Sequence, residues 1–218
     1  MTIAEPIPID DATATRFAMY AALARALEFP SREFHAEVDD GHFADGVSAM
    51  IDGLPYALPH AADIDGLREA GEYIDFQAEY IRLFDVGPMR PPLPLYGGEW
   101  GTTRKRSMEE DLRFYRFFGM KVDESCKELP DHVTIELEFM QMLAFTEGTM
   151  RASGDDALPF LRAQRDFLER HPGRGWPMLR RKMAGFERSR FYDSLTDLAD
   201  AFFAADLAYL RSAVVAAA

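Results

Sequence analysis

Residues 130–150 read PDHVTIELEFMQMLAFTEGTM, and this stretch decides the fold class. Pro130 suits the first turn of a helix, where its missing N–H costs nothing. Apolar side chains then recur at three- and four-residue spacing: Val133, Leu137, Met140 and Ala144 on one side, with Ile135, Phe139 and Met142 beside them. A helix that is apolar on two sides has to be covered on two sides, so we expect it at the centre of a helical protein.

The same periodicity predicts helices in most of the remaining chain. They fall at about residues 10–29, 31–38, 47–51, 62–84, 107–118, 155–170, 176–188 and 191–215. Alternating β-branched runs and internal repeats are both missing from the sequence. We therefore predict an all-α, single-domain bundle of roughly eight helices over residues 1–218, with a flexible tail at 1–10 and Pro/Gly-rich linkers at 85–106 and 119–130.

Composition and charge exclude several classes of protein. Apolar residues make up 48% of the chain, enough for a sizeable core, and the net charge is −13. Residues 1–80 hold 16 acidic against 4 basic side chains. An acidic surface repels phosphate backbones, so nucleic acid is not expected as a partner, whereas a basic peptide is; the alternative is that the charge only maintains solubility.

The N-terminus and the hydrophobic segments indicate a cytoplasmic location. Residues 1–17 contain no basic region, no continuous apolar run and no twin arginine, so no export signal is expected. No segment approaches the roughly 18 consecutive apolar residues of a membrane span. The single cysteine, Cys126, excludes an intramolecular disulfide and suits a reducing compartment.

Sequence signatures of catalysis are missing. The chain has no phosphate-binding loop, no dinucleotide-binding fingerprint and no nucleophile elbow. None of its five histidines stands in a metal-binding spacing, so we expect no enzyme activity, metal or cofactor. The alternative is a small helical metal-dependent enzyme that uses Asp131, His132 and Glu136.

Three segments could instead contact a partner. Tyr80, Leu83 and Phe84 end a predicted helix directly before the proline-rich loop, and they form either core or the wall of a peptide groove. The loop itself carries Tyr96 and Trp100 in an extended stretch. The third segment is the start of the central helix.

The start of the central helix combines polar side chains with the free backbone N–H groups of a helix N-terminus. Its candidate partner-binding residues are Asp131, His132, Glu136 and Glu138. The alternative is structural: Asp131 caps the helix, and His132 satisfies a nearby backbone group.

Together these segments resemble the TorD/DmsD/NarJ family of redox-enzyme maturation chaperones. The resemblance rests on YIRLF at 80–84, PPLPLY at 91–96 and PDHVTIELEFM at 130–140, and it extends over roughly residues 10–215. Two positions depart from the family pattern: Phe76 stands where an acidic residue is common, and Gly97-Gly98 follow the loop tyrosine where many members have Glu-Ser. The loop and the following Arg104-Lys105-Arg106 are also similar to maturation subunits of periplasmic enzymes that act on small substrates such as dimethyl sulfide, ethylbenzene, chlorate or selenate.

The resemblance implies a TorD-like helical chaperone that binds the leader peptide or apo form of a molybdenum-containing catalytic subunit of the dimethyl-sulfoxide-reductase superfamily. It would assist cofactor insertion and proofread the subunit before export or assembly. Arginines of the leader would meet Asp131, Glu136 or Glu138, and its apolar part would meet Tyr80, Leu83 and Phe84. A structural subunit that remains in the finished redox complex is the alternative. The long linkers would permit a helix-swapped dimer as well as a monomer.

Overall fold

The computed structural model describes residues 9–87, 90–121 and 128–217. Within these ranges the protein is helical, and its single β contact is an isolated antiparallel bridge between Tyr96 and His132. The α-helices are α1 (Asp11–Ala26), α2 (Arg32–Asp39), α3 (His42–Gly53), α4 (Tyr73–Tyr80), α5 (Arg104–Phe117), α6 (Val133–Ser153), α7 (Leu158–Arg170), α8 (Pro172–Met183) and α9 (Arg190–Ala216). Three short elements accompany them: η1 (Gly66–Arg68), the π-turn η2 (Ile81–Asp85) and η3 (Gly97–Glu99).

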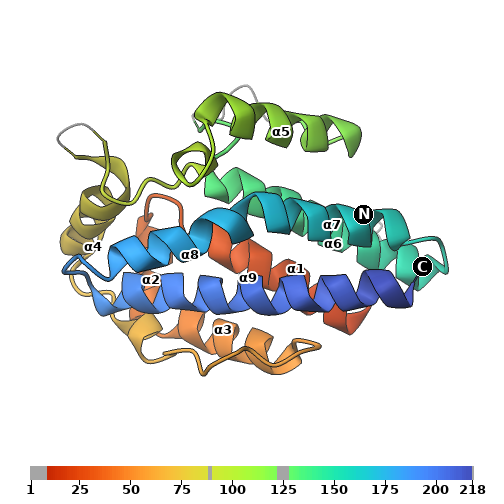
Figure 1. Ribbon diagram of the computed structural model, residues 1–218. Coiled ribbons are helices and arrows are strands. Elements are labelled where there is room, and N and C mark those ends of the chain that lie inside the picture. The colour runs from red at the N-terminus through yellow and green to blue at the C-terminus, as the bar shows by residue number, and fades with distance from the viewer. Residues whose placement is uncertain (1–8, 88–89, 122–127, 218) are drawn as a thin grey trace, which may run out of the picture.

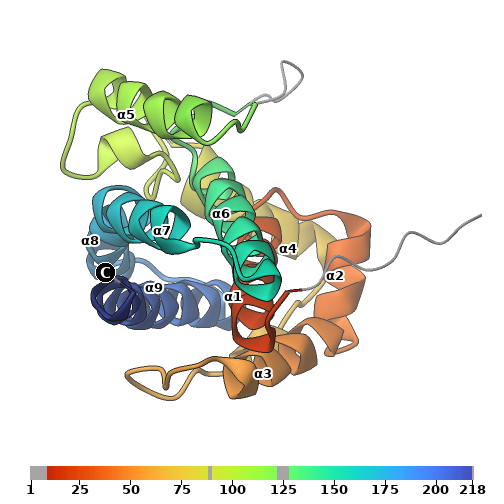
Figure 2. The ribbon, with the colours of Figure 1, turned by 90° about the vertical axis from the view of Figure 1, so that its right-hand side faces the viewer.

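The central position expected for α6 is confirmed. This helix packs along α1 on one side and against α7 on the other, and α9 runs across the front of α1 in the view of Figure 1. Leu137, Met140 and Ala144 are completely buried, as the apolar pattern predicts. Figure 2 shows α5 and its preceding loop lying over one end of α6, with α3 on the opposite side of the bundle.

A buried polar cluster joins four of these helices. The Arg16 guanidinium on α1 donates to Asp206 on α9 at 2.6 Å, to Glu147 on α6 at 2.8 Å and to Gln164 on α7 at 2.6 Å. All four side chains are completely buried. A buried arginine needs such partners, because an unpaired charge in the core costs several kcal/mol.

Several predicted helix starts are confirmed by capping geometry. The side chains of Asp10 and Ser31 accept hydrogen bonds from the backbone N–H three residues later, and Ser189 caps α9 in the same manner. Thr103, four residues before the predicted start at Ser107, caps α5. At α6 the cap is His132, so the interpretation of Asp131 as the capping residue was wrong.

Three predicted segments differ from the structure. The helix predicted over 62–84 begins only at Tyr73, because Gly66 packs against Ser194 of α9 and Gly71 has a φ of +63°, which ends a regular helix. The break predicted at 171–175 is the start of α8: Pro172 occupies its first position, and Gly175 allows close contact with Trp100. The stretch predicted at 47–51 is part of the longer α3.

A candidate partner-binding groove

A groove of about 440 Å³ opens where the end of α1, the end of α4 and the start of α6 meet. We call it the acidic groove. It is lined by Glu28, Phe29, Tyr80, Phe84, Asp85, Tyr96, Glu128, His132 and Thr134. Its floor and rim are therefore aromatic, and the charged side chains of its described lining are all carboxylates.

The end of α4 supplies the aromatic floor. The Tyr80 hydroxyl donates to the backbone oxygen of Leu27 at 3.0 Å, which fixes the ring between α1 and α4. Phe84 and Phe29 both meet this ring edge to face, with centroids 5.3 and 5.7 Å away. Tyr80 ends α4 and lines the groove. The π-turn η2 then places Phe84 at the groove and Leu83 in the core, where it is completely buried. Phe29 is 51% exposed and forms the apolar rim.

The proline-rich loop supplies the opposite wall. Val133 N–H donates to Leu95 O at 2.8 Å, and Gly97 N–H donates to Asp131 O at 2.7 Å, so the loop is attached to the start of α6 on both sides of Tyr96. The Tyr96 hydroxyl donates to Glu128 at 2.5 Å, and its ring meets His132 edge to face. These bonds hold Tyr96 in the groove wall.

His132 is neutral in this wall. Burial lowers the pKa of His132 to about 4, against a smaller opposing effect of Glu128. Its Nδ1 lies 2.7 Å from the Thr134 hydroxyl and accepts the Thr134 backbone N–H at the start of α6. A proton on Nδ1 would remove this acceptor, so the capping geometry and the burial favour the same neutral state.

The charges that line the groove are negative. Glu28, Asp85 and Glu128 are exposed, and no Lys or Arg belongs to the described lining. Burial and the neighbouring charge of Glu138 raise the pKa of Glu28, which indicates that Glu138 extends the acidic field beyond the groove. Arg104 lies beside the wall, with its guanidinium 5.0 Å from the centre of the Tyr96 ring. A cationic group entering the groove would reduce the repulsion among these carboxylates.

Four of the nine predicted partner-binding residues line this groove: Tyr80, Phe84, Tyr96 and His132. Glu138 is exposed beside it. The remaining four, Leu83, Trp100, Asp131 and Glu136, are buried elsewhere.

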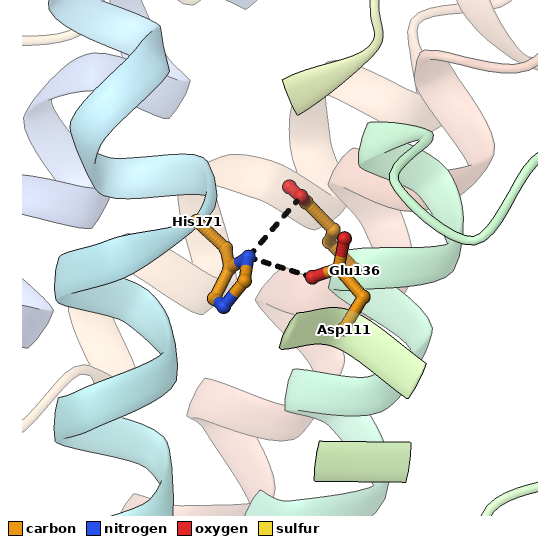
Figure 3. Close-up of side chains that lie close together, drawn as sticks. All are labelled: Asp111, Glu136 and His171. Carbon is orange, nitrogen blue, oxygen red and sulfur yellow. Dashed lines mark ion pairs between the residues drawn. The ribbon is translucent and has the colours of Figure 1, made fainter. Parts of the chain in front are cut away.

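The buried candidates have structural contacts instead. Trp100 donates to Pro94 O at 2.8 Å and packs on α8. Asp131 accepts the Gly98 N–H at 3.0 Å and so fixes the loop turn. Glu136 is directed toward Asp111 and His171 (Figure 3). A peptide in the groove would not reach these three side chains without rearrangement of the loop.

Sequence reasoning missed five groove residues: Glu28, Phe29, Asp85, Glu128 and Thr134. A sequence signal existed for the first two, since Glu28-Phe29-Pro30 directly follows α1 and its C-cap Leu27, and the proline prevents the helix from continuing. Phe76, at the position where the family often has an acid, is 2% exposed and stacks on Tyr192. That position is therefore core in this chain.

Comparison with known proteins finds one family model and several assembly chaperones of reductases. The family model described as nitrate reductase delta subunit matches residues 42–174. The perchlorate reductase assembly chaperone protein of Dechloromonas aromatica is 31% identical over 205 residues, covering 90% of each chain. The selenate reductase assembly chaperone protein of Thauera selenatis is 36% identical and covers 64% of this chain and 76% of its own. Chaperone protein TorD of Vibrio parahaemolyticus is 29% identical over 76% of both.

The fold also has a match among solved structures. A chain from Archaeoglobus fulgidus, described as a proposed redox enzyme maturation protein, superposes with a TM-score of 0.51. The alignment covers 92% of this chain and 99% of that one, at 16% identity. Among the described residues, none of the helices is both long enough and apolar enough to cross a membrane.

Proposed function

Because the chain belongs to the TorD/NarJ family of redox-enzyme assembly chaperones, whose named members are not enzymes, we propose that its acidic groove binds the leader peptide of a reductase catalytic subunit. The client would be a molybdenum-containing subunit held in its cofactor-free form. Binding would take place in the cytoplasm, before the subunit is exported or joined to its partners.

The composition of the groove carries this proposal. Three carboxylates, those of Glu28, Asp85 and Glu128, surround an aromatic floor with no cation in the described lining. A twin-arginine leader has the complementary composition, with basic residues next to an apolar stretch. Guanidinium groups would pair with the carboxylates, and apolar side chains would cover Phe29 and Phe84.

The size of the groove limits what enters it. A volume of about 440 Å³ lies within the range of roughly 300–1,000 Å³ found for small-ligand sites. It can hold a few side chains of an extended or helical segment, but not a folded domain. The groove would therefore recognise one segment of the client, and other surfaces would contact the rest.

Isothermal titration with the leader peptide of the molybdoenzyme subunit encoded nearest the gene tests the proposal. We expect micromolar or tighter binding, and weaker binding when the peptide arginines are changed to glutamine. The double variant Glu28→Gln/Glu128→Gln should bind about 2- to 30-fold more weakly, because two rim ion pairs contribute roughly 0.2–1 kcal/mol each.

A matched control separates the groove from overall charge. Asp52→Asn/Asp155→Asn removes two exposed carboxylates outside the groove, and its affinity should equal that of the unmodified protein. Phe29→Ala tests the apolar part, since its half-exposed ring can be removed with little effect on the core. Equal affinities for all these variants, or no binding to the leader, would refute the groove as the binding site.

A further inference from the structure

A second cluster of titratable side chains lies outside the groove, in the interior. Asp111 comes from α5, Glu136 from α6 and His171 from the junction of α7 and α8 (Figure 3). One ligand atom of each side chain lies within 4.8 Å of the other two. His171 Nδ1 is 2.6 Å from Asp111 Oδ1 and 3.9 Å from Glu136 Oε1.

These side chains are buried, and within residues 9–87, 90–121 and 128–217 five of their polar atoms have no hydrogen-bond partner. Asp111 is 0%, Glu136 1% and His171 2% exposed. Among the residues that the structure describes, both oxygens of Asp111, both ring nitrogens of His171 and Oε1 of Glu136 have no hydrogen bond of acceptable geometry. The short Asp111–His171 contact is misaligned for one. Each unsatisfied buried polar atom costs roughly 1–3 kcal/mol, so a concentration of them at one point indicates a missing partner.

A small cavity adjoins the cluster. It measures about 20 Å³ and is lined by Glu136, His171 and Gly97 together with apolar residues of α8 and the loop. A probe volume of roughly 10–15 Å³ accommodates one water molecule. A Cβ atom at Gly97 would come within 2.9 Å of Glu136 Oε1 and 3.0 Å of the Ser107 hydroxyl, so glycine keeps this space open.

The two buried carboxylates of the cluster, those of Asp111 and Glu136, suit a bound cation. Asp111 and Glu136 form no ion pair with a lysine or arginine anywhere in the described parts of the chain. Arg174 exerts an electrostatic effect on Glu136, but the two side chains make no ion pair. A divalent ion would neutralise both carboxylates and would leave the imidazole free to bind through Nδ1.

The ligand set and its spacing suit a transition metal. Imidazole nitrogen and carboxylate oxygen both bind divalent zinc, at about 2.0–2.2 Å. Tetrahedral ligands at that distance lie about 3.3 Å from one another. The observed separations of 2.6 and 3.9 Å lie on either side of this value, so shifts below about 1 Å would bring the three atoms into position.

We propose that Asp111, Glu136 and His171 bind one divalent transition-metal ion, with a water molecule in the adjoining cavity as a further ligand. The ring of His171 is already oriented for this role, because it stacks on Phe167 with centroids 4.3 Å apart. The ion would connect α5 to α6 and to the α7–α8 junction. It would thereby fix the base of the proline-rich loop.

Titration of chelator-treated protein with Zn²⁺ alone tests the proposal, with Mg²⁺ as the comparison ion. We expect one Zn²⁺ per chain, a higher melting temperature with Zn²⁺ and a clear preference over Mg²⁺. Asp111→Asn and His171→Gln should each weaken Zn²⁺ binding by at least about tenfold. His60→Gln is the matched control, since His60 is an exposed histidine 2.8 Å from Asp197, and it should leave the tight site unchanged.

A second readout does not depend on variants that could fail to fold. Co²⁺ added to the unmodified protein should produce the visible absorption of a low-symmetry site, and Zn²⁺ should displace it. Zn²⁺ uptake that is absent, or that is lost in His60→Gln and kept in Asp111→Asn and His171→Gln, would overturn the assignment. A variant that binds the leader peptide more weakly but still binds Zn²⁺ would have a defect in the acidic groove and not in the metal site. The groove and the cavity beside the metal site share no described lining residue other than Tyr96.

Discussion

Changing His132 to asparagine should alter how the stability of the protein depends on pH. His132 is 6% exposed, and its pKa of about 4 lies below the usual value near 6.5. The neutral ring is therefore the form that the folded state prefers. Stability from this preference is present in full above pH 6.5 and is lost as the pH falls toward 4.

The size of the effect follows from the two pKa values. With 6.5 in the unfolded chain and about 4 in the folded protein, the loss is about 1.4 kcal/mol at pH 5.5 and about 2.5 kcal/mol at pH 4.5. Asparagine does not titrate and is among the best N-cap residues, so His132→Asn should keep the start of α6. As the pH is lowered, the stability of the variant should therefore fall less steeply than that of the unmodified protein.

Urea unfolding of both proteins at pH 7.5, 5.5 and 4.5 measures this difference. All other titrating groups are common to the two proteins, so the comparison isolates His132. The stability difference should shift in favour of the variant by about 2–3 kcal/mol between pH 7.5 and 4.5. Parallel pH profiles would refute a buried neutral His132.

Two further changes test the interior. Arg16→Met should destabilise the protein by about 3–5 kcal/mol in thermal or urea unfolding, because it leaves buried carboxylates without their cation. Arg25→Met removes one partner of an exposed ion pair and should cost below about 1 kcal/mol. Equal losses of stability in the two variants would show that burial of the Arg16 cluster does not matter. Gly97→Ala should lower the melting temperature and abolish tight Zn²⁺ uptake, because the Cβ atom of the alanine would occupy the space beside Glu136. Unchanged Zn²⁺ affinity in a folded variant would show that this space is not needed for the metal ion.

The sequence alone predicted the helices whose signals are local. Apolar spacing located α6 at the centre, and Ser31 marked the start of α2. The first half of the 62–84 prediction failed because the decisive contact, Gly66 against Ser194, joins residues far apart in the chain. Helical periodicity cannot report such a contact.

The candidate groove was predictable only in part, for the same reason. Tyr80 and Tyr96 belong to family-like segments, and the acidic N-terminal third suggested a basic partner. Glu28 and Glu128 are 100 positions apart, and nothing in either local sequence indicates that they face one groove. The pairing of Asp111 with His171 likewise depends on tertiary packing alone.

Under the proposed function, the protein holds an immature reductase subunit through its leader. Size-exclusion chromatography with the catalytic subunit encoded nearest the gene tests it most directly, using the cofactor-free subunit, the cofactor-loaded subunit and the cofactor-free subunit without its leader. We predict a stable complex with the first, which Glu28→Gln/Glu128→Gln weakens, and little or none with the other two. Equal binding to the loaded subunit would contradict the chaperone function and would instead indicate a structural subunit of the finished enzyme.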